Sequence, residues 1–385
     1  MRFLFPTQLR CLLRRGFVLR AALVLLLGFA SATTAGAFDA RGAQFLGFTN
    51  FSLWKKSSGT NRTEVVLRSP EITACLDWNE LVASWNIALP ADGFLCVEAR
   101  AIQPDAATKF YVLGCWSADP QRHPRASVPG QRDADGDVAT DTLKLLRPCR
   151  KFQIGLILGG GTRLTDLKFL GMSLLDNRVR PAPLAPNRAA WGRTIAVPER
   201  SQMPFPNGGT LCSPAVVSML LGHWAGARQR PDWDRTVPEV AAGVDDPNWP
   251  GTGNWALNMA CAGALPGLRA YVARLSDVSE LEDWIARGVP VGLSLCYNRL
   301  RGQGGEPSGH LVVCVGFTEA GDVIVNDPGT SRNVRKTFPR ANLTAAWAYS
   351  RRTVYLVYPA DRAVPEDRFG HWDSSVSRRR MGPGN

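Results

Sequence analysis

The sequence lacks the closely spaced cysteines and histidines that hold a zinc ion. It contains no Cys-x-x-Cys pair, and its four histidines are far apart along 385 residues. Structural zinc sites draw their ligands from closely spaced cysteines and histidines. We therefore expect no zinc site, and neither a metal nor another cofactor.

The chain also lacks the features of a nucleic-acid binder or an integral membrane protein. The formal net charge is +12, but five basic residues precede residue 21 and the others are scattered, apart from Arg351-Arg352 and Arg378-Arg379-Arg380. No basic recognition helix is evident, so we expect no nucleic acid as a partner. Beyond residue 37 no segment is apolar enough to cross a bilayer, so we expect no stable membrane span once residues 1–37 are removed.

Residues 1–37 have the features of an export signal. Five arginines precede or flank the apolar run 21–30, and Ala35-Gly36-Ala37 is the small-x-small pattern of a cleavage site. Arg14-Arg15 and the residues after it resemble the twin-arginine export motif, with an ordinary secretory signal as the alternative. We expect a protein exported to the periplasm or the extracellular space.

Residues 38–178 show short β-type runs broken by turn residues, without a long helical period. This spacing predicts a β-sandwich accessory domain. The strand candidates are 81–89, 94–102, 110–116, 142–146, 152–158 and 164–174. Four cysteines, Cys75, Cys96, Cys115 and Cys149, lie in this region. In an oxidising compartment they allow two disulfides, and buried thiols are the alternative.

Prolines 181, 183 and 186 mark residues 179–197 as a stiff linker. The pattern after it is mixed: 214–224 and 278–287 favour helices, and 289–296, 311–317, 323–326 and 354–358 favour strands. The fold class predicted for the whole chain is α+β, with a second domain over 198–360. We expect the charged, Gly- and Pro-containing residues 361–385 to be a disordered tail.

Cys212 has the sequence context of a nucleophile. Gly208-Gly209 allow a tight backbone approach, Pro214 suits a first helical turn, and apolar residues then recur as on one buried helical face. A thiol at a helix N-terminus is stabilised as the thiolate, which is the attacking species. A small apolar cysteine at a helix start is the alternative.

The base is found by elimination among the histidines. His123 lies in a Pro-rich loop and His371 in the expected tail. His223 follows Cys212 by eleven residues on the same predicted helix, which separates the two by about 16 Å. His310 remains as the base.

Asp327 is the expected partner of His310. The strands 311–317 and 323–326 are joined by a short loop and predict a β-hairpin, with His310 at the start of the first strand and Asp327 after the second. The two residues should come within a residue or two of facing each other, while Asn326 should point the other way. Asp327 would then orient the imidazole as the acid of a catalytic triad does. A structural His–Asp pair is the alternative.

An oxyanion donor is also needed, and Gln202, ten residues before Cys212 in a loop, is the candidate beside the Cys212 N–H. A surface glutamine is the alternative.

Residues 195–360 resemble the secreted, stand-alone relatives of the bacteriocin-processing (double-glycine leader) cysteine peptidases. The motifs that carry the resemblance are Ser201-Gln202, Leu211-Cys212-Ser213-Pro214, Gly253-Asn254-Trp255, Gly288-Val289-Pro290-Val291, Ser308-Gly309-His310-Leu311 and Asp322 to Pro328, together with Ala346-Trp347 and Val354-Tyr355-Leu356-Val357.

The resemblance implies a papain-like fold with a Cys-His-Asp triad and a glutamine in the oxyanion hole. These roles fall on Cys212, His310, Asp327 and Gln202, although the interval from Gln202 to Cys212 is longer than in many papain-like enzymes. The resemblance also implies that Asn254 and Trp255 belong to the cleft wall. The double-glycine specificity of the transporter-fused members is not carried over.

The sequence thus predicts an exported cysteine peptidase-like hydrolase that acts on a peptide or protein, cell-envelope material included. A catalytically silent peptide-binding module and an amide-bond transferase with the same triad are the alternatives.

Overall fold

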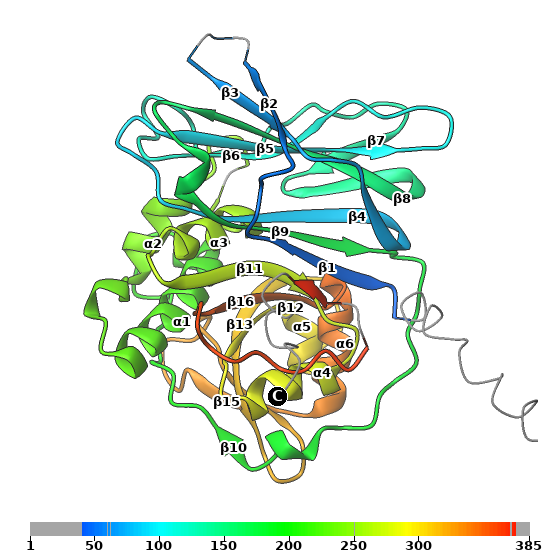
Figure 1. Ribbon diagram of the computed structural model, residues 1–385. Coiled ribbons are helices and arrows are strands. Elements are labelled where there is room, and N and C mark those ends of the chain that lie inside the picture. Colours follow the sequence, from blue (N-terminus) through cyan, green and yellow to red (C-terminus); the bar gives the residue numbers. More distant parts are fainter. Residues whose placement is uncertain (1–40, 60, 62, 250, 370–371, 375–385) are drawn as a thin grey trace, which may run out of the picture. The chain divides into compact units, whose positions relative to one another are not determined.

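The computed structural model describes residues 41–59, 61, 63–249, 251–369 and 372–374. The expected export signal, residues 1–37, lies outside them. The described residues belong to one compact unit that contains two sheets, both antiparallel except for one strand pair (Figure 1). Helices accompany the second sheet, so the predicted α+β class is confirmed.

The first sheet comes almost entirely from the N-terminal half. Its strands within the described residues are β1 (Ala43–Phe48), β2 (Lys55–Ser58), β3 (Val65–Arg68), β4 (Ile72–Ile87), β5 (Phe94–Ile102), β6 (Tyr111–Ser117), β7 (Gly136–Ala139), β8 (Thr142–Gly159), β9 (Leu167–Leu175) and β17 (Trp372–Ser374). They are ordered β17-β1-β9-β4-β8-β3-β2, with β5 and β7 also on β8, and β6 on β5.

The long strand β8 joins the two layers of this sheet. Its first half pairs with β4 and β7, and its second half pairs with β3 and β5. Figure 1 shows β4, β9 and β1 on one side and β5, β3 and β2 on the other. The sequence predicted two strands, 142–146 and 152–158, where one exists. Pro148 lies between them, where the β4–β8 register is irregular, and such a bulge accommodates proline inside a strand.

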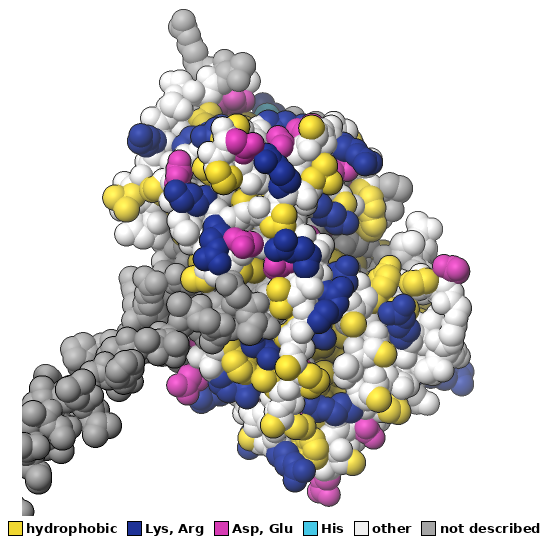
Figure 2. Space-filling model, turned by 90° about the vertical axis from the view of Figure 1, so that its right-hand side faces the viewer, with side chains coloured by type: hydrophobic (Ala, Val, Ile, Leu, Met, Phe, Trp, Pro, Cys, Tyr) yellow, Lys and Arg dark blue, Asp and Glu magenta, His cyan; other side chains and the backbone are white. Residues whose placement is uncertain are grey.

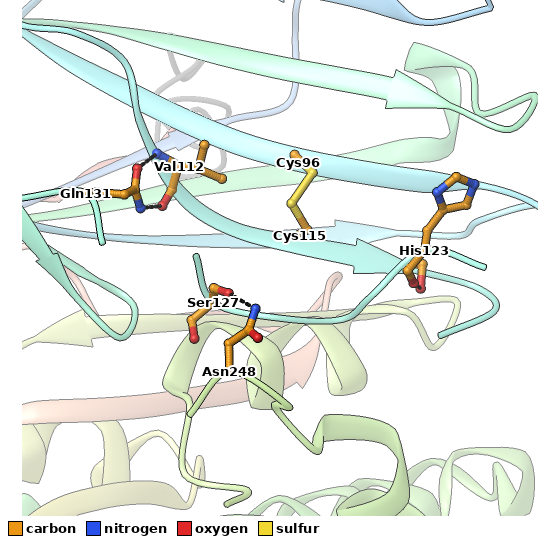
Figure 3. Close-up of a disulfide and its surroundings, with 8 residues drawn as sticks. Cys96, Val112, Cys115, His123, Ser127, Gln131 and Asn248 are labelled. Atoms are coloured by element: carbon orange, nitrogen blue, oxygen red, sulfur yellow. Dashed lines mark hydrogen bonds between the residues drawn. A yellow bond between two sulfur atoms is a disulfide. The ribbon is translucent and has the colours of Figure 1, made fainter. Parts of the chain in front are cut away.

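The disulfide of this region is Cys96–Cys115, which joins neighbouring positions of β5 and β6 (Figure 3). Cys75 is an exposed thiol and Cys149 a buried one. One of the two disulfides that the sequence allowed is therefore present, and the other two cysteines are thiols.

The second sheet is built from the C-terminal half. Its strands are β10 (Arg193–Thr194), β11 (Leu268–Arg274), β12 (Val291–Cys296), β13 (Gly309–Phe317), β14 (Val323–Asn326), β15 (Arg335–Phe338) and β16 (Thr353–Pro359), in the order β11-β16-β12-β13-β14-β15 with β10 on β13. The α-helices are α1 (Cys212–Arg228), α2 (Val237–Val244), α3 (Trp255–Gly263), α4 (Val278–Ala286), α5 (Tyr297–Leu300) and α6 (Arg340–Trp347). Single 3-10 turns are η1 (Leu164–Asp166), η2 (Arg188–Ala190), η3 (Gly208–Thr210), η4 (Pro231–Trp233) and η5 (Ala348–Ser350).

Polar side chains of β4 connect the two sheets along the outer edge of β11. The Asn86 amide donates to the Ala270 carbonyl (2.7 Å) and accepts from the Ala270 N–H, so it mimics a neighbouring strand. Two residues earlier, the Ser84 hydroxyl accepts from the Val272 N–H. These contacts satisfy backbone groups that an edge strand would leave unpaired.

A second contact between the halves involves the loop after β6. The Ser127 N–H donates to the Asp246 carboxylate, and the Asn248 side chain donates to the Ser127 carbonyl (Figure 3). The loop before α3 is therefore fixed by the β-rich region.

Two short strands fall in segments that the sequence placed outside the domains. β10 lies in the predicted linker 179–197 and pairs with β13. β17 lies in the predicted tail 361–385 and runs parallel to β1. Residues 370–371 and 375–385 of that tail are outside the described residues.

Within the described residues, no helix combines the length and apolar character that a bilayer crossing requires. On the face seen in Figure 2, Lys and Arg side chains are spread among acidic and apolar ones.

Candidate active site

Cys212 is the first residue of α1, directly after the 3-10 turn Gly208–Thr210. Pro214 lies in the first turn, as the sequence predicted. The prediction of one buried face is wrong, because every residue from Ser213 to Leu221 is buried. The helix packs against α2 and α3 and against β12, β13 and β16.

His310 and Asp327 meet at the end of the predicted hairpin. His310 is the second residue of β13, and Asp327 follows β14. Val313 pairs with Asn326, which places Asp327 two positions from the level of His310. The His310 Nε2 lies 2.8 Å from the Asp327 Oδ1. Asn326 points elsewhere and donates to the Val197 carbonyl, so the expected pairing of His310 with Asp327 is present.

Both oxygens of the Asp327 carboxylate have donors. Oδ1 also accepts from the Gly329 N–H, and Oδ2 accepts from the Tyr297 hydroxyl at 2.7 Å. The Tyr297 ring lies against the His310 ring, with centroids 4.2 Å apart. Sequence reasoning missed Tyr297, because only the pairing of β12 with β13, which puts Leu295 opposite His310, brings it there.

The site is arranged for a thiolate beside an imidazolium. Burial raises the pKa of the Cys212 thiol, but its hydrogen bond to His310 and the charge of that ring outweigh this, so the net pKa is below the usual value. Burial lowers the pKa of His310, yet its hydrogen bonds to Asp327 and Cys212 raise it to about 9. Burial also acts to raise the pKa of Asp327. The hydrogen bonds from His310 and Tyr297 outweigh burial, so the net pKa is below the usual value. Since Nε2 faces Asp327, Nδ1 is the nitrogen left for the thiol.

Gln202 is buried rather than on the surface. Its N–H donates to the carbonyl of Pro328, next to Asp327, and its side-chain amide donates to the carbonyl of Gly208 at 2.5 Å. One of the two amide hydrogens is therefore taken up by the turn before Cys212. The Gln202 side chain does not line the cleft described next.

A cleft of about 730 Å³ contains Cys212 and His310 in its wall. The C-terminal half contributes mainly small and aromatic residues, namely Gly209, Thr210, Trp249, Gly251, Thr252, Gly253, Trp255, Ser294, Gly309, Leu311, Tyr349 and Ser350, together with Arg274 and Arg351. The N-terminal half contributes Glu80, Ala139, Thr140, Asp141, Thr142 and Lys144. The cleft is therefore shared by both halves.

The β7–β8 turn shapes this wall from the N-terminal side. Asp141 is buried there and accepts from the N–H of Trp255, the first residue of α3, at 2.5 Å. Burial raises the pKa of Asp141. The preceding Thr140 has a left-handed backbone (φ 60), a conformation that β-branched residues rarely adopt.

Of the two residues that the resemblance placed in the cleft wall, one lines the cleft and the other does not. Trp255 lines the cleft. Asn254 is buried as the N-cap of α3, where its side chain accepts from the Leu257 N–H and donates to Asp246. In the part of the chain that the structure describes, no group of three His, Cys, Asp or Glu side chains is placed to hold a metal ion.

Family models match segments in both halves of the chain. Residues 194–355 match the model of the Peptidase_C39 like family. This segment is a C39-like domain. Residues 56–171 match a second model, described as a Peptidase C39 N-terminal domain. The chain thus combines a C39-like domain with the β-rich domain that carries the same family name, in agreement with the resemblance to bacteriocin-processing peptidases.

Solved structures include one described as a C39-like peptidase from Bacillus anthracis. It is 16% identical in sequence, and the alignment covers 43% of this chain and 97% of that one, with a TM-score of 0.32. A comparison with curated proteins finds no significant match.

Proposed function

We propose that the protein is an exported thiol hydrolase that cleaves a peptide or amide bond through Cys212, His310 and Asp327. The observation that carries this proposal is one line of contacts. Cys212, at the start of α1, lies beside His310 in the cleft wall, and His310 is hydrogen-bonded to Asp327. Cys212 and His310 both line a cleft large enough for a peptide segment. Membership of the C-terminal half in a peptidase-like family agrees with this chemistry.

In the proposed reaction the Cys212 thiolate attacks the carbonyl carbon of the scissile bond. The first N–H groups of α1 have no intrahelical acceptor, so the Cys212 N–H is available to the oxyanion. Gln202 would supply the second donor only after its amide turns from Gly208 toward the cleft, which its side chain does not line. The protonated His310 gives its proton to the leaving amine, which breaks the bond and leaves a thioester on Cys212.

Water then completes the cycle. His310, now neutral, takes a proton from the water that attacks the thioester, and the acid product leaves as the thiolate is restored. Asp327 keeps the ring oriented through both steps, because Nε2 stays bonded to its carboxylate.

Export is supported by the redox state of the N-terminal half. Its strands β5 and β6 are joined by a disulfide, and disulfides persist mainly outside the reducing cytosol. Substrates in the cell envelope or outside the cell follow from this location.

Alkylation tests the nucleophile. Iodoacetamide at pH 6 should modify Cys212 much faster than Cys75, an exposed thiol that serves as an internal control, since only Cys212 has a bonded imidazolium. Turnover of a peptide library should be lost in Cys212→Ala and kept in Cys75→Ala.

Reaction of Cys212 no faster than a model thiol, together with unchanged turnover in Cys212→Ala, would refute the proposal. Addition of an amine nucleophile separates hydrolysis from transfer, because a transferase would give an amide product in place of the acid.

A further inference from the structure

One end of the cleft carries a row of charged residues that crosses from one half of the molecule to the other. Lys144 of β8 pairs in register with Glu80 of β4, and the Glu80 Oε2 accepts from the Arg274 Nη1 of β11 at 2.7 Å. Arg274 in turn pairs in register with Thr353, two residues after Arg351. All four charged side chains line the cleft.

The two carboxylates at this end already have donors. Glu80 is buried and accepts from Asn177 through Oε1 and from Arg274 through Oε2. Asp141 accepts from the Trp255 N–H through Oδ2 and from the Thr142 hydroxyl through Oδ1. Glu80 is thus ion-paired with Arg274, whereas these two donors to Asp141 are neutral.

The positively charged side chains at this end, by contrast, still have donor groups without acceptors. Lys144 and Arg351 are exposed, and within the described residues neither side chain makes an ion pair or hydrogen bond. Arg274 is buried, and its Nε has no partner there. This end of the cleft therefore has three positive charges, from Lys144, Arg274 and Arg351, against the two carboxylates of Glu80 and Asp141, inside the same cleft as the thiol.

We infer that this end of the cleft is a subsite for a carboxylate of the substrate peptide, held by Lys144 and Arg351 with Arg274 behind them. The inference rests on the proposed function, because it assigns the substrate class of that site. A carboxylate brings the acceptor oxygens that these donors lack, and charge-assisted bonds of this kind orient a chain in a cleft. The carboxylate is either an acidic side chain or the free C-terminus of a peptide.

The experiment uses matched peptide sets that differ in a single group. One set carries Glu, Gln or Lys at each position around the cleaved bond, and a second set ends in a free acid or an amide. We expect the best acidic peptide to exceed its neutral match in kcat/KM by about tenfold at low salt, and less at high salt, because exposed charges are screened. The set that shows the preference identifies the source of the carboxylate.

Charge reversal makes the test specific. Lys144→Glu and Arg351→Glu should remove or invert the preference for acidic peptides, measured as the ratio of kcat/KM for an acidic peptide to kcat/KM for its neutral match. Lys168→Glu, on β9 and outside the cleft lining, is the matched control and should change nothing. Thermal melting of each variant checks that it folds. If a charge-reversal variant does not fold, the milder changes Lys144→Gln and Arg351→Gln replace it.

Binding to the Cys212→Ala variant separates this inference from the proposed function. Fluorescence anisotropy should show tighter binding of acidic than of neutral peptides even where no turnover occurs, and that result supports the subsite when hydrolysis itself fails. Equal binding and equal turnover of acidic and neutral peptides, or a preference that survives both charge reversals, would overturn the inference.

Discussion

The two halves of the molecule share one cleft but contribute different chemistry to it. The C39-like half supplies Cys212, His310 and Asp327 from one helix and one hairpin. The β-rich half supplies the β7–β8 turn with Asp141 and two further charged residues, Glu80 and Lys144, but none of the three triad residues. The chemistry therefore resides in the C39-like half, whereas both halves form the cleft wall, so substitutions in the β-rich half should change substrate selection without removing a triad residue.

The largest expected effect is in the C39-like half. His310→Ala should lower kcat/KM about a thousandfold or more, since it removes both the partner of the thiolate and the proton donor. His223→Gln is the matched control. His223 lies farther along α1, where its ring is hydrogen-bonded to the Ala196 carbonyl, and turnover should stay within about threefold of the wild type. Peptide turnover measures both, and equal losses in the two variants would contradict the assignment.

The contact between the halves should matter for stability. Asn86→Ala leaves the N–H and the carbonyl of Ala270 without partners in a buried place, which should lower the free energy of unfolding by about 2–4 kcal/mol. The exposed Asn61, whose side chain donates to Glu64, provides the control Asn61→Ala, with a change below about 0.5 kcal/mol. Urea unfolding gives both values. Coincident unfolding curves for Asn86→Ala and the wild type would show that the β4–β11 contact adds no stability.

The smallest effect concerns the pH dependence of the site. The active form pairs a thiolate with a protonated His310. With increasing pH, kcat/KM should rise as Cys212 loses its proton, at a pH below the usual thiol pKa. It should fall again above about pH 9, where His310 loses its proton. Tyr297→Phe keeps the ring against His310 but removes the donor to Asp327. The carboxylate then holds the imidazolium more strongly, which should move the alkaline limb upward and lower kcat/KM by about threefold to tenfold.

Tyr349→Phe, an exposed ring in the same cleft, is the control for that profile and should leave both limbs in place. An alkaline limb that stays fixed in Tyr297→Phe would assign Tyr297 to packing alone.

Local sequence patterns predicted those parts of the fold whose signals are local. The strand 94–102 and the strand 323–326 have the predicted bounds, and α1 was expected from Pro214 and the apolar run after it. The strand β11 and the helix α3 were not expected. Nearly every residue of α3 is buried, which removes the apolar–polar period by which a helix is recognised.

The sequence by itself determined the position of Cys212 at a helix start and the hairpin that joins His310 to Asp327, because both depend on residues close together in the chain. Tertiary structure alone decided that Tyr297 reaches Asp327 and that Lys144 shares a cleft with Arg351. These pairs come together through pairing between distant strands, whose register depends on packing across the whole core rather than on the residues beside each one.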